Sequence, residues 1–135
     1  MQKKNTRGFT LLELLIALAI LAIIAAILIP NFFATTDRAR LRSDIQSARV
    51  IQNAIELYRA ERGEMPEGTN MSTILETLSG AGFLNVSHYD IQTEGAVWDT
   101  DPDIGVIVDI SGSHDNIQSV YASLPAAEQL FVRAR

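Results

Sequence analysis

The amino-acid sequence predicts an α+β protein. A long, proline-bent N-terminal helix spans a membrane with its first half and packs with its second half on a small antiparallel β-sheet head. Three observations predict this class: an apolar block near the N-terminus, an amphipathic stretch with helical spacing behind it, and short strand-like runs separated by turn residues. The 135 residues leave room for one modest domain besides the apolar block.

Charge and cysteine content narrow the function classes. The formal net charge is -5 at pH 7, and the stretch from Glu64 to Glu128 holds eleven acidic residues and no Lys or Arg. Such an acidic head repels phosphate backbones, so we expect no direct nucleic-acid binding. The chain has no cysteine, which excludes disulfides, thiolate zinc sites and cysteine nucleophiles.

The apolar block is long enough to cross a bilayer. Sixteen residues from Leu14 to Ile29 carry no polar side chain, and the wider range 9–33 reaches roughly 37 Å as a helix, against a hydrocarbon core of about 30 Å. A cleaved secretory signal is the alternative, but the block is longer than a usual signal core and no small-residue cleavage pattern follows it. Charge alone leaves the orientation open, because basic residues flank both ends. They are Lys3, Lys4, Arg7, Arg38, Arg40 and Arg42.

A motif at the start of this block resembles the processing site of type IV pilins and of the pseudopilins of type II secretion or competence systems. Behind a short basic leader it reads Gly8-Phe9-Thr10-Leu11-Leu12-Glu13-Leu14. The resemblance covers roughly the first 62 residues. It implies a pilin-like fold, cleavage after Gly8 by a prepilin peptidase, N-methylation of the new terminal residue Phe9, and a head outside the cytoplasm.

Glu13 is the single ionisable side chain between Arg7 and Asp37. A charge inside a bilayer costs on the order of 3 kcal/mol, so something must offset it. One interpretation is structural: Glu13 lies near the interface, in the first turns of the helix, where the helix dipole favours a negative charge. The other follows from the resemblance, which pairs this glutamate with the free amine of Phe9 in a neighbouring subunit and thereby sets the register between subunits.

Pro30 and the residues behind it describe the rest of the helix. A proline removes one backbone hydrogen bond, so we expect a bend at Pro30, with a helix end at Ile29 as the alternative. An amphipathic helix follows and stops at Gly63, before Pro66. Its predicted core stripe is Leu41, Ile45, Ala48, Ile51, Ile55 and Tyr58, widened by Val50, Ala54 and Leu57, while Asp44 and Gln52 are among the residues placed on other faces.

The head is predicted to contain one small helix and three or four antiparallel strands. The helix lies around Ile74, Leu75 and Leu78, in the loop that follows Tyr58. The predicted strands are 86–91, 96–98, 104–110 and 119–122, and the segment 125–135 is either a short helix after Pro125 or a last strand through 130–132. The expected segments are the leader 1–8, the transmembrane and filament-core half-helix 9–33, the amphipathic half-helix 34–62, and the extracytoplasmic head 63–135.

Few constellations in the head could carry chemistry. Asp99, Asp101 and Asp103 alternate in a turn-rich stretch, the kind of oxygen cluster that suits calcium. The alternative is a solvated acidic turn, because Gly105 falls one place late for the twelve-residue calcium loop and Ile110 stands where that loop needs a glutamate. The run from Ser113 to Asp115 has the letters of a hydrolase triad, but adjacent side chains diverge. We therefore expect no enzyme activity and no required cofactor.

The arginines behind the span have two interpretations. They contact either anionic lipid headgroups or the acidic head of an adjacent subunit. The residues are Arg38, Arg40, Arg42 and Arg49.

These expectations converge on a structural filament subunit with about 20 to 25 apolar residues per chain in a common helical core. It is a single-pass membrane protein first and part of a cell-surface or periplasmic filament later, in adhesion, motility, secretion or DNA uptake. The implied partners are copies of itself, other pilin-like subunits, the prepilin peptidase, and an inner-membrane assembly platform with its ATPase. The alternative is a membrane-anchored extracytoplasmic binding domain that does not polymerise.

Overall fold

The computed structural model describes residues 9–85 and 89–135. The chain forms two compact units, Met1–Phe33 and Ala34–Arg135, and helix α1 (Leu11–Arg62) contributes to both. Helix α1 ends where the sequence predicts: Gly63 has a φ of +76°, and its N–H donates to the Arg59 carbonyl over 2.9 Å. Because α1 runs through position 30, the alternative of a helix end at Ile29 is wrong, and the bend at Pro30 stays a prediction.

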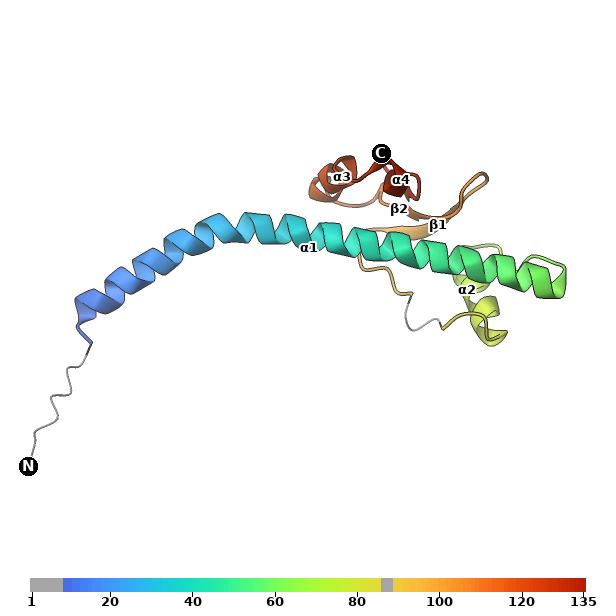
Figure 1. Ribbon diagram of the computed structural model, residues 1–135, viewed down its shortest axis with the longest axis horizontal. Coiled ribbons are helices and arrows are strands. Elements are labelled where there is room, and N and C mark those ends of the chain that lie inside the picture. Colours follow the sequence, from blue (N-terminus) through green and yellow to red (C-terminus); the bar gives the residue numbers. More distant parts are fainter. Residues whose placement is uncertain (1–8, 86–88) are drawn as a thin grey trace, which may run out of the picture. The chain divides into compact units, whose positions relative to one another are not determined.

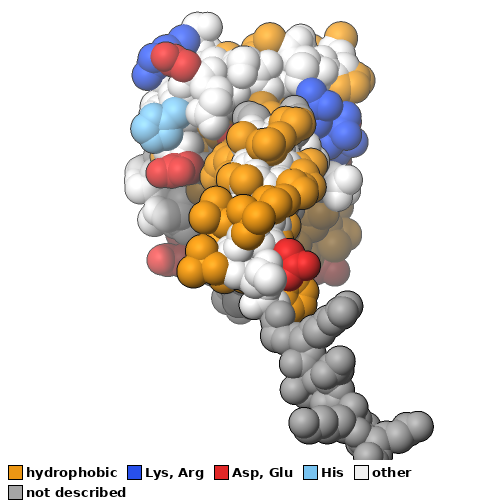
Figure 2. All heavy atoms as spheres, turned by 90° about the vertical axis from the view of Figure 1, so that its left-hand side faces the viewer, with side chains coloured by type: hydrophobic (Ala, Val, Ile, Leu, Met, Phe, Trp, Pro, Cys, Tyr) orange, Lys and Arg blue, Asp and Glu red, His pale blue; other side chains and the backbone are white. Residues whose placement is uncertain are grey.

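The first unit is the apolar part of α1, and its side chains face outward. Every Leu, Ile and Phe from Phe9 to Phe33 is between 47% and 86% exposed, and Figure 2 shows hydrophobic side chains covering this part of the helix. Fully burying sixteen such residues would be favourable by roughly 25–50 kcal/mol. By length and composition this helix is apolar and long enough to cross a membrane.

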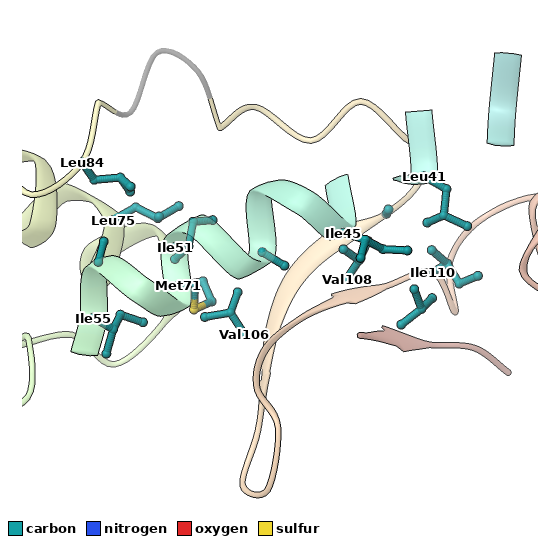
Figure 3. Close-up of a cluster of buried hydrophobic side chains, with 14 of the residues drawn as sticks. Leu41, Ile45, Ile51, Ile55, Met71, Leu75, Leu84, Val106, Val108 and Ile110 are labelled. Carbon is teal, nitrogen blue, oxygen red and sulfur yellow. The ribbon is translucent and has the colours of Figure 1, made fainter. Parts of the chain in front are cut away.

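The core of the second unit forms along the predicted stripe of α1. All six predicted stripe residues are buried, and Ala54 joins them. Helix α2 (Met71–Gly80) and the sheet lie beside this half of α1 in Figure 1. In Figure 3, Leu41 and Ile45 lie near Val108 of β2 and near Ile110, the residue that follows β2. Farther along α1, Ile51 and Ile55 lie near Met71 and Leu75 of α2.

The sheet has three strands, but it is not purely antiparallel. Strands β1 (Val97–Asp101) and β2 (Gly105–Asp109) pair antiparallel as a hairpin. Strand β3 (Val132–Arg133) pairs parallel with β2, so the strand order is β1-β2-β3 and the prediction of an antiparallel sheet is wrong for β3. The chain reaches β3 through two helices, which act as a crossover and bring the last strand back in the same direction as β2.

One predicted strand is a helix, and the described part of another is irregular. Residues 119–122 belong to helix α3 (Asp115–Ala122), whose buried residues Ile117 and Val120 are spaced by three, as a helix requires. Of the predicted strand 86–91, residues 89–91 are irregular and residues 86–88 lie outside the described residues. The C-terminal segment contains both predicted forms, because helix α4 (Ala126–Gln129) follows Pro125 and β3 follows α4.

Four positions on α1 lie on a different face from the one predicted. Val50 and Leu57 are exposed, so they do not widen the core stripe. Asp44 is only 1% exposed, and Gln52 turns inward to accept a hydrogen bond from the N–H of Val106 over 3.1 Å. The cause is that β2 and the segment before β1 cover polar positions of α1 that periodicity alone assigns to solvent.

Candidate functional site

The processing segment lies at the start of α1. Gly8 is outside the described residues, while Phe9 and Thr10 precede the helix and Glu13 lies in its first turn. The backbone N–H and the hydroxyl of Thr10 donate to Glu13 Oε2 over 3.0 and 3.1 Å, and the N–H of Glu13 donates back to Thr10 Oγ1 over 3.2 Å. This reciprocal arrangement is a capping box, with Thr10 as N-cap and Glu13 as the third helical residue.

The capping box explains how a carboxylate is held at the start of an apolar helix. Glu13 satisfies one of the backbone donors that a helix N-terminus leaves unpaired, and its charge lies where the helix dipole favours it. All of these bonds join Thr10 and Glu13, so cleavage after Gly8 would leave them in place. Within residues 9–85 and 89–135, the second carboxylate oxygen, Oε1, has no hydrogen bond and can accept one from outside the chain.

Sequence reasoning missed Thr10, although its signal was readable. The pattern Thr-x-x-Glu directly before an apolar run is the capping-box signature, and this chain contains it at positions 10 and 13. Thr10 is therefore the residue that positions Glu13.

The acidic turn lies at the β1–β2 hairpin, and the carboxylates of Asp99 and Asp101 already have partners. Asp101 Oδ1 accepts hydrogen bonds from the N–H groups of Asp103 and Ile104 over 2.9 and 3.2 Å, which closes the turn. Arg133 of β3 pairs with Asp99 and lies 3.9 Å from Asp101.

The strand order explains why Arg133 reaches these carboxylates. Asp99 is opposite Ile107 and Asp109 is opposite Arg133 in the ladder, so all four side chains lie on the same face of the sheet. Burial raises the pKa of Asp109, but hydrogen bonds from Ser111 and the charge of Arg133 lower it more, so its pKa lies below the usual value. Among the described residues, no group of three or more acidic or histidine side chains is arranged to hold a metal ion. Calcium at Asp99, Asp101 and Asp103 stays a prediction.

Three of the four arginines behind the apolar block contact the C-terminal segment of their own chain. An Nη2 hydrogen of Arg38 is donated to Ser123 Oγ over 2.8 Å, and Arg42 Nε lies 3.0 Å from Glu128 Oε2. The guanidinium of Arg49 lies 4.6 Å from the centre of the Phe131 ring. Neither lipid nor an adjacent subunit is needed to explain these three residues. The fourth, Arg40, is 4.0 Å from Asp37, one turn back on the same helix.

Ser113, His114 and Asp115 do not form a catalytic triad. Ser113 is buried and its hydroxyl has no hydrogen-bond partner among the described residues. His114 points to solvent and lies 3.9 Å from Glu94, and Asp115 is in the first turn of α3. The contact between nucleophile and base that a triad needs is therefore not formed.

Aromatic side chains line the edges of the core. The ring of Phe83 packs edge-on against Tyr58 at 5.4 Å, and Trp98 Nε1 donates to the Tyr89 carbonyl over 3.0 Å. Trp98 and Tyr89 border an open hollow of about 530 Å³ between α2 and β1. The titratable side chains at its border are Glu76, Tyr89 and Asp90.

Comparison with known proteins finds one family model, which matches near the N-terminus, and several relatives. Residues 3–29 match the family model described as the prokaryotic N-terminal methylation motif. The type II secretion system core protein G of Aeromonas hydrophila is 30% identical over 66 residues, which are 49% of this chain and 46% of that protein. The type IV wide pilus major component PilA4 of Thermus thermophilus is 61% identical over 36 residues, 27% of this chain and 28% of that protein.

One match extends into the head. The fimbrial protein EcpC of Eikenella corrodens is 29% identical over 112 residues, 83% of this chain and 73% of that protein. Against its type II secretion relatives, by contrast, this chain spans about half of their length. No solved structure matches the chain.

Proposed function

We propose that this chain, whose N-terminal segment carries the prepilin motif of the type IV pilin and pseudopilin family, is a structural subunit of a type IV pilus-like filament. A prepilin peptidase cleaves it after Gly8, and the new N-terminus at Phe9 is methylated. The mature chain remains in the membrane, with its head outside the cytoplasm, until it is assembled. It then joins copies of itself and other pilin-like subunits, driven by an assembly platform and its ATPase.

The observation that carries the proposal is the fully exposed apolar half of α1. A helix with this much outward apolar surface is stable only in lipid or among similar helices. The leader that precedes it is basic, with Lys3, Lys4 and Arg7. Because moving three cations into an apolar layer is costly, the leader keeps the uncut chain in the membrane, and its removal allows the helix to pass from lipid into a bundle.

Glu13 supplies the register in this proposal. Oε2 is held by Thr10, and Oε1 is available to the amine of a neighbouring Phe9. A charged pair inside an apolar layer is strongly position-dependent, because either charge alone would be left without a partner. One placement of the incoming subunit is therefore favoured over all others.

The test uses cells in which the variant is the only source of this chain. We expect the Glu13→Ala chain to insert into the membrane and to reach the wild-type level in cells. The amount of this chain in sheared filaments should be at least about tenfold below that of the wild type. Leu12→Ala changes a neighbouring residue without touching the carboxylate and serves as the matched control. Mass spectrometry of wild-type filaments should show a chain that begins with methylated Phe9.

Two outcomes contradict the proposal. Wild-type filament yield from Glu13→Ala would remove the role of the carboxylate. An uncut chain that stays dispersed in the membrane would favour the non-polymerising anchored domain instead. Electron microscopy of the filament, together with identification of the proteins that copurify with it, then assigns it to pilus, secretion or DNA-uptake function.

A further inference from the structure

Strand β1 is an edge strand, and its outer backbone groups face away from the sheet. The strand order is β1-β2-β3, so β1 has a neighbour on one side only. The N–H of Val108 in β2 donates to the Phe131 carbonyl over 2.8 Å, so the backbone of Val108 faces β3. Trp98 is opposite Val108 in the antiparallel ladder. Because opposite residues in such a ladder exchange either both hydrogen bonds or none, the N–H and C=O of Trp98 point to the free edge.

The same geometry applies to Thr100, two residues farther along β1. Its partner Val106 donates its N–H to Gln52 Oε1 over 3.1 Å and therefore does not donate to β1. The N–H of Thr100 donates to Oδ1 of the adjacent Asp99 over 2.8 Å. Within the part of the chain that the structure describes, no strand pairs with this edge. Such an edge is a template for a further strand.

Two hollows border the free edge and give side chains of a further strand room. The hollow of about 530 Å³ is lined by the first two residues of β1 and by Leu75 of α2. A second hollow, of about 400 Å³, is lined by the last two residues of β1 and by Ile74 of α2. A groove between an edge strand and a helix is one of the arrangements by which domains bind an extended peptide through strand addition.

Both hollows have carboxylates at their borders and no cation. Glu76 and Asp90 are exposed at the first hollow. Glu56, Asp101 and Asp103 border the second. Among the described residues that line either hollow, none is a lysine or an arginine. The charge of the site therefore complements a basic occupant.

We infer that the free edge of β1 and the two hollows bind an extended segment of another protein, in which apolar residues alternate with lysine or arginine. The segment joins the sheet beside β1 and forms hydrogen bonds with the outer backbone groups of Trp98. Successive side chains of a strand point to opposite faces. One set enters the hollows, whose walls include Leu75 and Ile91, and the other set reaches the carboxylates at the borders. The inference goes beyond the proposed function, because it gives the head a site for a partner that is not a filament subunit.

A second copy of this chain does not supply such a segment. Beyond Gly8, its basic residues lie in α1 except for Arg133 and Arg135 at the C-terminus. A helical segment cannot add to a sheet as a strand, and Arg133 already pairs with Asp99 in its own sheet. Pairing β1 with β1 of another copy would bring acidic side chains together, which destabilises a ladder.

The test measures peptide binding to the full chain in neutral detergent, followed by the fluorescence of Trp98, which is the single tryptophan and lines the larger hollow. The probe is a short peptide of alternating valine and lysine, and it should bind saturably. A peptide of the same length with glutamate in place of lysine should bind at least about tenfold more weakly, because every charge contact becomes repulsive.

Methylated peptides separate strand addition from simple charge attraction. The valine–lysine peptide is made with methyl groups on all valine nitrogens or on all lysine nitrogens, so that each version loses the hydrogen bonds of one edge. Charge is the same in both. At least one version should bind at least about tenfold more weakly than the parent peptide, because two or more hydrogen bonds to β1 are lost. If both bind like the parent, the inference is wrong.

Variants of the chain test the same site from the other side. Thr100→Pro places a ring in the path of an added strand and removes an N–H that is not part of the β1–β2 ladder, so the strand itself should persist. Affinity for the valine–lysine peptide should fall at least about tenfold, whereas the control Thr100→Val keeps both backbone groups and should bind like the wild type. Glu76→Gln combined with Asp90→Asn should lower the affinity about fivefold and reduce its dependence on salt.

Every outcome bears on the inference. No saturable binding of the valine–lysine peptide, equal binding of the valine–glutamate peptide, or wild-type affinity in a folded Thr100→Pro chain would each overturn it. If urea unfolding shows that Thr100→Pro is not folded, the methylated peptides on the wild-type chain decide the question. A dimer of the wild-type chain that sedimentation detects and that Thr100→Pro abolishes would overturn the choice of partner. Filament yield tests the proposed function separately: wild-type chains that form no filament would contradict that function and leave peptide binding unchanged.

Discussion

Asp44 offers a sharp test of how the head is fixed to α1. Its side chain is buried, and its two carboxylate oxygens accept the N–H groups of Gln92 and Thr93 over 2.9 and 2.8 Å. Replacing it by Ala removes the acceptor of both N–H groups, one on the buried residue Thr93 and one on the exposed residue Gln92. Two hydrogen bonds to a charged acceptor contribute about 3–6 kcal/mol, and the relief of no longer burying a charge offsets part of that, so we expect Asp44→Ala to lower the free energy of unfolding by about 2–4 kcal/mol.

Asp44→Asn refines the same prediction. An amide keeps one acceptor oxygen but presents its NH₂ group to the second N–H, so roughly half of the loss should remain. This ordering, with Ala worse than Asn and Asn worse than wild type, depends on two bonds being present.

The assay is urea unfolding of the full chain in detergent, followed by the fluorescence of Trp98. Trp98 is the single tryptophan, and its indole donates to the carbonyl of Tyr89, three residues before Gln92. The control is Glu61→Ala, an exposed carboxylate on the same helix, which should change stability by less than about 0.5 kcal/mol. If Asp44→Ala were as mild as Glu61→Ala, the proposed contribution of the two hydrogen bonds would be refuted.

Two further predictions concern the β1–β2 hairpin and the sheet. Gly105 has a φ of +94°, and an added Cβ would meet the side-chain amide of Gln52, so Gly105→Ala should destabilise the head by about 1–3 kcal/mol. The control is Gly80→Ala in α2, where a Cβ has free space, and this substitution should be neutral or slightly stabilising. Urea unfolding of both variants measures the difference. The depressed pKa of Asp109 should give stability that is fully present above its unfolded pKa of about 3.9 and lost as pH falls through the lower folded pKa. The difference in unfolding free energy between wild type and Asp109→Asn should therefore shrink in acid, and a difference that grows below pH 4 would contradict the assigned direction.

The sequence was sufficient to predict those features of the fold that depend on residues close together in the chain. The burial of Leu41, Ile45 and Ile51 follows from their spacing on an amphipathic helix, and the helix end follows from Gly63. Helix α3 was missed although Ile117 and Val120 show helical spacing, because β-branched residues also suit a strand. The capping box of α1 was equally local and equally readable.

The contacts between distant segments were decided by tertiary structure alone. The sequence pattern predicts that Asp44 faces solvent. In the fold, the backbone at Gln92, 48 residues later in the chain, covers its carboxylate and donates a hydrogen bond to it. The sequence alone suggests that Arg42 contacts lipid or another subunit, but in the fold Glu128 lies beside it. A last strand was one of the two predictions for the C-terminal segment, but its parallel direction follows from no local pattern.

The sequence by itself determined that an apolar helix behind a basic segment precedes a small acidic head, because hydrophobic spacing and motif residues act within a few turns of one chain segment. Tertiary structure decided which polar side chains of that helix, such as Asp44 and Gln52, form hydrogen bonds inside the head, and which apolar side chains, such as Val50 and Leu57, remain exposed. The physical reason is that burial and charge pairing depend on where distant backbone groups and carboxylates finally lie, and the residue itself does not encode that position.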